Sequence, residues 1–180
     1  MHRAALPRRA RVAAAAAVRG IGGGVHADTA AHHAGAGALA AAADLGLTSV
    51  DVLARRPESC SDLQSTGDLL GLELHIVSWQ DPEITLDHDL VISTVPAGAA
   101  DSLIHKIPRQ PQLLLDVVYQ SWPTPIAQAW TAAGGQAVSG LEILLHQGVR
   151  QVALMTGHEV EADQIRPELM VAAGLTPPKD

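Results

Sequence analysis

Short apolar runs alternate with longer helix-like stretches along this chain from about residue 38 onward. The short runs are rich in Val, Ile and Leu, as buried parallel strands are, and the stretches between them have the length and the Ala and Leu content of helices. The pattern predicts strands at residues 49–54, 72–77, 90–95, 113–119 and 136–138. It predicts the end of a helix at residues 38–45, and helices at residues 60–70, 100–105, 125–133, 141–155 and 161–173. This alternation indicates an α/β fold, a Rossmann-like doubly wound parallel sheet in a single domain.

Glycine, threonine and proline mark the ends of several of these predicted helices. Gly46 and Gly71 each follow a helical stretch, where glycine readily adopts the left-handed conformation that ends a helix. Thr124 followed by Pro125 has the chemistry of a helix start, because threonine caps the first N–H groups and proline at the first position loses no hydrogen bond.

Composition narrows the class of protein further. The chain has 180 residues, 47% of them apolar, and it contains no Phe, so its core must consist mainly of Ala, Val, Leu and Ile. That length fits one domain. Cys60 is the only cysteine in the sequence and cannot form an internal disulfide, which favours the cytoplasm over a secreted, disulfide-stabilised fold.

The charge of the chain argues against two classes of partner. A formal net charge of −7 disfavours general binding to nucleic acid or to an anionic membrane, because such proteins present a basic surface. No uninterrupted apolar stretch approaches the roughly 18 residues that would span a bilayer. The charge is uneven, with a balance of +4 in residues 1–43 and −11 in the remainder.

Residues 1–37 form an atypical start, rich in Ala, Arg and Gly, and residues 38–176 form the predicted domain. A targeting peptide is one interpretation, since Arg8 and Arg9 precede an apolar run, but Arg19 closes that run early. A disordered segment and a poorly specified strand and helix are others. We also hypothesise a shifted reading frame or a faulty gene start, because of the bias in residue types. Resequencing the gene, and searching for peptides from this segment, would test that hypothesis.

Arg55 and Arg56 follow the strand predicted at residues 49–54. In doubly wound folds, the residues after the second strand meet the adenosine ribose of a dinucleotide. An acidic residue there would favour NAD, whereas guanidinium groups would bind the 2′-phosphate of NADP through charge-assisted hydrogen bonds. The pair therefore points to NADP, against the alternative that two arginines at a strand end are merely solvated.

Three further segments, taken in order, make the chain resemble the shikimate dehydrogenase family. The first is Ser93-Thr94-Val95-Pro96, which follows a predicted strand and is similar to the loop beneath the nicotinamide in that family. The second is Asp116-Val117-Val118-Tyr119 with Thr124-Pro125, which is similar to the Asp-x-x-Tyr-x-x-x-x-Thr-Pro pattern of the family. The third is Gly140-Leu141 with Leu144 and Gln147, which resembles a late helix of the family. The resemblance covers about residues 38–157.

The resemblance implies roles for individual residues. It implies that Tyr119 and Gln147 contact substrate hydroxyls and that Gly140 lets the backbone approach the nicotinamide. Ile143 stands where the family often has Met, an exchange of one apolar side chain for another. Arg55 stands where the Asn-Arg-Thr pattern of the family has its arginine, with Ala54 and Arg56 in place of the neighbours. The full set of cofactor contacts implied is Arg55, Arg56, Ser93, Thr94, Val95, Pro96, Gly140 and Ile143.

The phosphate-binding loop departs from the family pattern. A dinucleotide fold needs glycines between its first strand and first helix, so that the backbone can reach the pyrophosphate. Gly20-Ile21-Gly22-Gly23-Gly24 is one candidate, but counting back from Gly46 by the usual helix length of the family places the loop near residues 30–33. Near these candidate loops lie the histidines His26, His32 and His33. They could suggest a metal, but no matching ligand cluster follows, and we expect no metal site.

The second departure concerns the acid–base residues. The resemblance implies a substrate domain preceding the cofactor domain and supplying a Lys and an Asp, whereas Lys106 and Lys179 lie in segments that do not match. We expect no catalytic residue in this chain, which by itself would be inactive. The function that the resemblance implies is NADP-dependent interconversion of 3-dehydroshikimate and shikimate, on the path to chorismate and the aromatic amino acids.

Two alternatives to that function stay open, together with the partners of the chain. One is a non-catalytic NADP-binding fragment or module that needs a separate substrate domain, and the other is a quinate or shikimate dehydrogenase relative. A cofactor-domain relative such as glutamyl-tRNA reductase fits less well, because Tyr119, Thr124-Pro125 and Gln147 favour the shikimate branch. Shikimate is the expected small-molecule partner. A separate substrate domain or a second copy of the chain is the expected protein partner, since apolar surface around residue 141 would otherwise be exposed.

Overall fold

The computed structural model describes residues 12–16, 25–81, 86–159 and 161–172. The chain divides into two compact units, Met1–Ser139 and Gly140–Asp180, which are described one at a time. The predicted single domain at residues 38–176, with an atypical start before it, stays a prediction. Among the described residues, no helix combines the length and the apolar character needed to cross a membrane.

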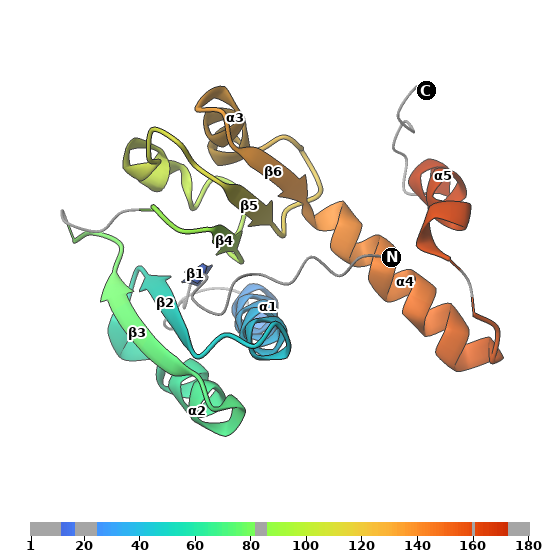
Figure 1. Cartoon of the computed structure of the whole chain (residues 1–180), viewed down its shortest axis with the longest axis horizontal. Helices are drawn as coiled ribbons and strands as arrows, with labels where there is room; N and C mark the ends of the chain where they lie inside the picture. Colours follow the sequence, from blue (N-terminus) through green and yellow to red (C-terminus); the bar gives the residue numbers. More distant parts are fainter. Residues whose placement is uncertain (1–11, 17–24, 82–85, 160, 173–180) are drawn as a thin grey trace. The chain divides into compact units, whose positions relative to one another are not determined.

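The first unit is built on a parallel sheet with helices on both faces (Figure 1). Its strands are β1 Val12–Ala16, β2 Ser49–Ala54, β3 Glu73–Ser78, β4 Leu90–Ser93, β5 Leu113–Asp116 and β6 Gln136–Ser139. Its helical elements are α1 Val25–Asp44, η1 Pro57–Ser59, α2 Ser61–Leu70, η2 Asp101–Lys106 and α3 Pro125–Ala132. The strands lie in the order β3-β2-β1-β4-β5-β6, and every pair is parallel. The predicted doubly wound sheet is confirmed.

Two hydrophobic clusters lie against the sheet, and successive residues of its strands belong to different clusters. Val52 and Ala54 of β2 belong to the cluster that includes residues of α1 and α2. Leu53, between them in sequence, belongs to the cluster that includes residues of η2 and α3. Because side chains of a strand point alternately to opposite faces, this division shows that both faces of the sheet are covered.

Glycines end helices α1 and α2 as the sequence predicts. Gly46 has a φ of 81° and Gly71 a φ of 70°, both in the left-handed region. At the end of α1, the Leu47 N–H donates to the Ala42 carbonyl and the Gly46 N–H to the Ala43 carbonyl, which is the paired bonding of a Schellman motif. These turns direct the chain from each helix into the next buried strand.

Strands β4 and β5 are shorter than predicted, and each has a local physical reason. The prediction carried β4 to residue 95, but β4 ends at Ser93, shortly before Pro96, which has no N–H to donate to a neighbouring strand. The prediction carried β5 to residue 119, but β5 ends at Asp116, whose carboxylate accepts a hydrogen bond from the Val118 N–H at 3.2 Å. That side-chain bond turns the backbone away from the sheet.

The start of the chain contributes the central strand and the first helix of the sheet. Residues 12–16 pair with β2 on one side and β4 on the other. The expectation that the phosphate-binding loop falls near residues 30–33 is wrong, because those residues lie inside α1. Helix α1 begins at Val25, earlier than that count places the start of the helix. The other candidate, Gly20 to Gly24, lies outside the described residues.

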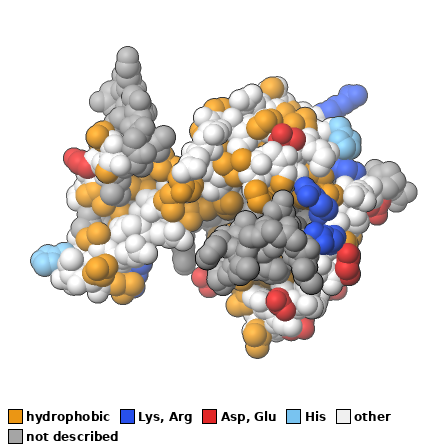
Figure 2. All heavy atoms as spheres, turned by 180° about the vertical axis from the view of Figure 1, so that it is seen from behind, with side chains coloured by type: hydrophobic (Ala, Val, Ile, Leu, Met, Phe, Trp, Pro, Cys, Tyr) orange, Lys and Arg blue, Asp and Glu red, His pale blue; other side chains and the backbone are white. Residues whose placement is uncertain are grey.

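The second unit consists of two helices, α4 Gly140–Thr156 and α5 Ala162–Ala172. Arg166 of α5 forms an ion pair with Glu142 of α4, and a small pocket of about 180 Å³ lies between the helices beside this pair. Figure 2 shows orange apolar side chains at the surface of this unit. The large apolar residues that are exposed include Leu144, Val152, Leu154, Met155 and Val171.

Candidate dinucleotide-binding site

The candidate residues of the first unit gather at one edge of the sheet. Arg55 follows β2, Thr94 follows β4 and Val117 follows β5. Because all the strands are parallel, their carboxyl ends lie at the same edge. Strand order reverses at β1, so a ligand lying across that edge would meet residues after β2 and β3 on one side and after β4 and β5 on the other.

A pocket of about 420 Å³ lies beyond the ends of β4 and β5. We call it the Tyr119 pocket; its lining is Ala34, Thr94, Val95, Pro96, Ala97, Val117, Val118, Tyr119, Gln120 and Ser121. The structure thus brings together two segments that the sequence singled out, the loop after β4 and the turn after β5. Tyr119 is 40% exposed, so this residue is open to contact with a ligand. No carboxylate, imidazole or amine belongs to this lining among the described residues.

The turn that carries Tyr119 is held by buried hydrogen bonds. Asp116 is 2% exposed, and its second carboxylate oxygen accepts a hydrogen bond from the Thr124 hydroxyl at 2.7 Å. The Thr124 hydroxyl oxygen in turn accepts from the Ala127 N–H at 3.3 Å, as the N-cap of α3. The Asp and the Thr-Pro of the sequence pattern therefore fix both ends of the turn, and Tyr119 lies between them.

Ser93 joins the ends of β4 and β5 through its backbone. Its carbonyl accepts a hydrogen bond from the Val117 N–H at 3.0 Å. The Ser93 hydroxyl is buried and has no hydrogen-bond partner among the described residues. Ser93 does not line the Tyr119 pocket, whereas its neighbours Thr94, Val95 and Pro96 do, so a direct cofactor contact of its side chain stays a prediction.

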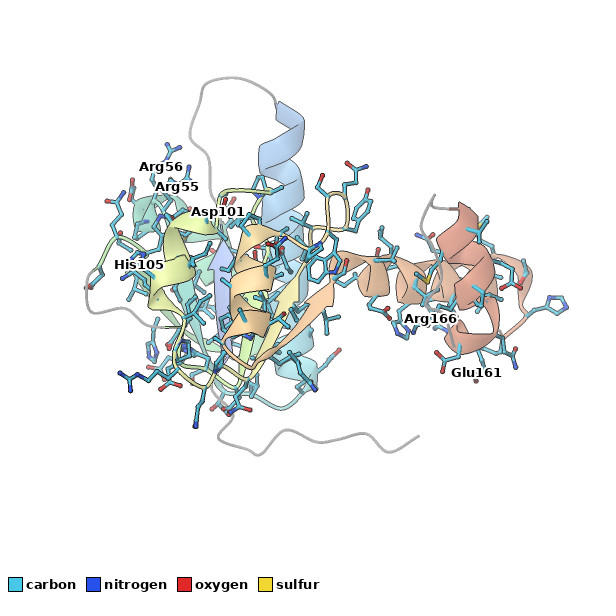
Figure 3. All side chains as sticks on the ribbon, turned by 90° about the horizontal axis from the view of Figure 1, so that it is seen from above. Arg55, Arg56, Asp101, His105, Glu161 and Arg166 are labelled. Carbon is cyan, nitrogen blue, oxygen red and sulfur yellow. The ribbon has the colours of Figure 1, made fainter. Side chains whose placement is uncertain are left out.

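A second pocket, of about 680 Å³, lies beyond the ends of β2 and β3. We call it the Arg55 pocket; its lining is Arg55, Trp79, Gln80, Ser102, His105 and Lys106. The lining carries the positive charges of an arginine and a lysine, and no Asp or Glu of the described residues belongs to it. Figure 3 shows Arg55, Arg56 and His105 on the same side of the first unit. Such a wall suits an anionic group such as a phosphate.

Arg56 has a different environment from Arg55. Arg56 does not line the Arg55 pocket, and it is the residue before helix η1. Its carbonyl accepts a hydrogen bond from the Ser59 N–H at 3.1 Å. Of the two arginines, only Arg55 lines the pocket, and a contact of Arg56 with the cofactor stays a prediction.

The remaining predicted contacts lie on α4, in the second unit. Gly140 is the first residue of α4 and is buried, Ile143 is half-buried and Gln147 is exposed. They share one helix, and their roles as contacts of cofactor or substrate stay predictions.

Titratable residues also meet away from the carboxyl edge, around Asp51 of β2. The Nε2 atom of buried His88 lies 2.7 Å from one Asp51 oxygen, and Nδ1 of His75 lies 3.1 Å from the other. Burial works to raise the pKa of Asp51, but the bonds from the two histidines outweigh it and lower that pKa. Among the described residues, no group of His, Cys, Asp and Glu side chains could hold a metal ion.

The fold and these two pockets define a class. A parallel sheet in the order β3-β2-β1-β4-β5-β6, with pockets past its carboxyl edge on both sides of β1, is the architecture of dinucleotide-binding domains. Cations at one pocket and an uncharged, largely apolar lining at the other fit the two ends of a phosphorylated dinucleotide.

Comparison with known proteins shows which family the chain resembles. Residues 140–170 match the model of the shikimate 5′-dehydrogenase C-terminal domain. A shikimate dehydrogenase (NADP(+)) of Thermoplasma acidophilum is 30% identical over 133 residues, which are 72% of this chain and 46% of that protein. The crystal structure of Mycobacterium tuberculosis shikimate dehydrogenase matches with a TM-score of 0.74 and 26% identity, over 90% of this chain and 57% of that one. A shikimate 5-dehydrogenase from Mycobacterium fortuitum matches with a TM-score of 0.63 and 30% identity, over 87% of this chain and 54% of that one.

The chain is similar to the shikimate dehydrogenases, and its residues 140–170 match the model of their C-terminal domain. It spans about half the length of the curated relatives it matches, or less. The family resemblance read from the sequence motifs is confirmed.

Sequence reasoning missed most of the Arg55 pocket. It singled out Arg55 but not Trp79, His105 or Lys106, which line the same pocket. For Trp79 a signal existed, because it follows the strand predicted next after the strand of Arg55, and ends of neighbouring parallel strands meet. For His105 and Lys106 no comparable signal existed, since the place where η2 packs depends on the sheet as a whole.

Proposed function

We propose that this chain is the NADP-binding part of a shikimate dehydrogenase, which interconverts 3-dehydroshikimate and shikimate. The observation that carries the proposal is the pairing of two pockets at one edge of the sheet, one cationic and one lined by the motif that ends in Tyr119. The relatives are NADP-dependent by name, in agreement with arginine rather than an acidic residue after β2.

The proposed cofactor lies with its adenosine end in the Arg55 pocket and its nicotinamide end in the Tyr119 pocket. The guanidinium of Arg55 would bind the 2′-phosphate, and the loop Thr94 to Pro96 would line the nicotinamide. NADP, when bound, supplies the hydride acceptor or donor of the reaction. Pro96 is exposed and has no N–H, so this loop offers an apolar surface to a flat ring.

The chain's own contribution to substrate is proposed to be binding and orientation. The hydroxyl of the exposed residue Tyr119 is proposed to hydrogen-bond to a substrate hydroxyl, and Gln147 is proposed as a second such contact. The described lining of the Tyr119 pocket contains no carboxylate, imidazole or amine that could exchange a proton with substrate near neutral pH. Lys106 lines the other pocket, where its ammonium donates to the Asp81 carbonyl at 2.6 Å.

Proton transfer is therefore assigned in this proposal to a substrate domain, whether covalently joined to these residues or supplied as a separate chain. A second copy of the chain is a further proposed partner, because apolar side chains of α4 and α5 are exposed. The cytoplasm is the proposed location, given a single buried cysteine, Cys60, and the biosynthetic reaction.

Titration of the purified chain with NADPH and with NADH tests the cofactor assignment, followed by the fluorescence of the bound nicotinamide. We expect NADPH to bind more tightly, and shikimate oxidation to appear only when a substrate domain is added. Failure to bind either nucleotide would contradict the proposal. For the variant Arg55→Ala, the matched control is Arg109→Ala. This control also removes one positive charge, but from an exposed residue outside both pockets.

A further inference from the structure

The sheet itself brings Arg55 and Trp79 together. Ala54 and Ser78 are register partners at the ends of β2 and β3, and Arg55 and Trp79 are the residues that follow them. The Trp79 N–H donates to the Ala54 carbonyl at 3.1 Å, so the parallel bonding continues past the last paired residues. The guanidinium carbon of Arg55 then lies 4.9 Å from the centre of the Trp79 ring. This distance is within the range of a cation–π contact.

Trp79 is a fixed platform, whereas Arg55 is exposed. The Trp79 side chain is only 4% exposed and packs in the hydrophobic cluster that includes Leu53, Val95 and Leu103. An exposed arginine would otherwise lose much rotamer freedom on binding a ligand, which costs roughly 1.5–2 kcal/mol for such a side chain. A guanidinium already resting on a buried ring has lost part of that freedom before the ligand arrives.

The wall that η2 contributes completes the surroundings of this guanidinium. Ser102 and His105 offer hydrogen-bonding groups, and Lys106 offers a second cation held by its bond to Asp81. A phosphate beside Arg55 would therefore meet cationic and hydrogen-bonding groups from two separate elements. Arg56 lines no part of this pocket.

We propose that Trp79 is a positioning residue, whose ring holds the guanidinium of Arg55 where it binds a ribose 2′-phosphate. Recognition of that phosphate is then a property of the Arg55–Trp79 pair rather than of the two adjacent arginines. The inference deepens the proposed function and rests on it for the identity of the ligand. It predicts that Trp79 affects phosphate binding only when Arg55 is present.

The test uses titration calorimetry to measure the affinity of the chain for adenosine 2′-monophosphate, adenosine 5′-monophosphate, NADPH and NADH. The variants are Trp79→Leu, Trp79→Phe, Arg55→Ala, Arg56→Ala and the double variant Trp79→Leu with Arg55→Ala. Loss of a cation–π contact predicts affinity for the 2′-monophosphate weaker by about threefold to tenfold in Trp79→Leu. Trp79→Phe, which keeps an aromatic face, is expected to restore part of that loss, and Arg56→Ala to change affinity less than Arg55→Ala does.

The double variant separates positioning from general damage to the fold. If Trp79 acts through Arg55, Trp79→Leu has no further effect on 2′-monophosphate affinity once Arg55 is alanine. Equal weakening of both monophosphates in Trp79→Leu, or the same weakening with and without Arg55, would overturn the inference. If the leucine variant is poorly folded, the arginine variants keep the test decisive, because equal losses of 2′-monophosphate affinity in Arg55→Ala and Arg56→Ala also overturn the inference.

The two proposals fail in different ways. Binding of the 2′-monophosphate that depends on Arg55 and Trp79, without binding of NADPH, would support this inference and contradict the proposed function. A clear preference for NADPH that does not respond to Trp79 would contradict this inference alone. Absence of any 2′-monophosphate binding would overturn it outright.

Discussion

Replacing Thr124 by valine should destabilise the first unit more than the small change in shape suggests. Thr124 is 3% exposed, and its hydroxyl donates to Asp116 at 2.7 Å while accepting from the Ala127 N–H at 3.3 Å. Valine keeps the volume and removes both bonds. The buried Asp116 carboxylate would keep only the bond that the structure gives it from the Val118 N–H, and α3 would lose its cap.

The expected magnitude follows from those two losses. A lost N-cap costs about 0.5–2 kcal/mol, and a lost hydrogen bond to a charged group about 1.5–3 kcal/mol. Because the two bonds share one hydroxyl and are not additive, we expect a fall of about 2–4 kcal/mol in the free energy of unfolding. Thr124→Ser is the matched control. It keeps the hydroxyl and removes one methyl group, a loss of about 1 kcal/mol.

Urea unfolding followed by tryptophan fluorescence would measure the difference. Trp130 lies on α3 and is fully buried, so its emission reports the loss of this part of the core. A valine variant as stable as the serine variant would refute the reasoning, since only the serine variant keeps the hydroxyl. We also expect weaker NADPH binding in Thr124→Val, because the turn that carries Tyr119 ends at this residue.

Three other predictions concern packing, pH and the second unit. Gly67→Ala should lower the midpoint of thermal unfolding, because an added Cβ would lie 2.6 Å from Leu74 Cγ. In the control Gly37→Ala the added Cβ has nothing within 4 Å, and the free energy of unfolding should rise by about 0.5–1 kcal/mol. The bonds of His75 to Asp51 and Glu73 raise the pKa of His75. The contribution of His75 to the free energy of unfolding is therefore fully present below pH 6.5 and is lost as the pH rises through the raised pKa. Urea unfolding of wild type and His75→Ala should therefore differ more below pH 6.5 than well above it, and a constant difference would contradict this. Arg166→Ala should increase amide hydrogen exchange in α5, since Arg166 pairs with Glu142 of α4; unchanged exchange would show that the pair does not hold the helices together.

Local patterns were sufficient to predict most of the fold. Glycines in left-handed conformation end α1 and α2, and the cap of α3 needs only Thr124 and Pro125, so each of these features depends on near neighbours in sequence. The parallel sheet follows from alternation, because strands connected through helices run in one direction. The ends of β4 and β5 were predicted too late, since the turn after β5 depends on a side-chain bond from Asp116 that apolar periodicity does not report.

The candidate site was only partly predictable from the sequence. Motifs after β4 and β5 located the residues of the Tyr119 pocket, because those motifs are contiguous in sequence. The Arg55 pocket combines residues from the ends of β2 and β3 with one face of η2. Its composition depends on the order of strands and on the packing of η2, so reading Arg55 and Arg56 as a pair overlooked Trp79.

The most direct test of the central claim is a change of cofactor preference through Arg55. An acidic residue after the second strand accepts hydrogen bonds from the 2′-hydroxyl of NAD and repels a 2′-phosphate. Titration of wild type and Arg55→Asp with NADPH and NADH should show a preference for NADPH that reverses, with NADPH affinity falling by about tenfold or more. An equal loss of affinity for both nucleotides, or a preference for NADPH that the substitution leaves unchanged, would contradict an NADP site at Arg55.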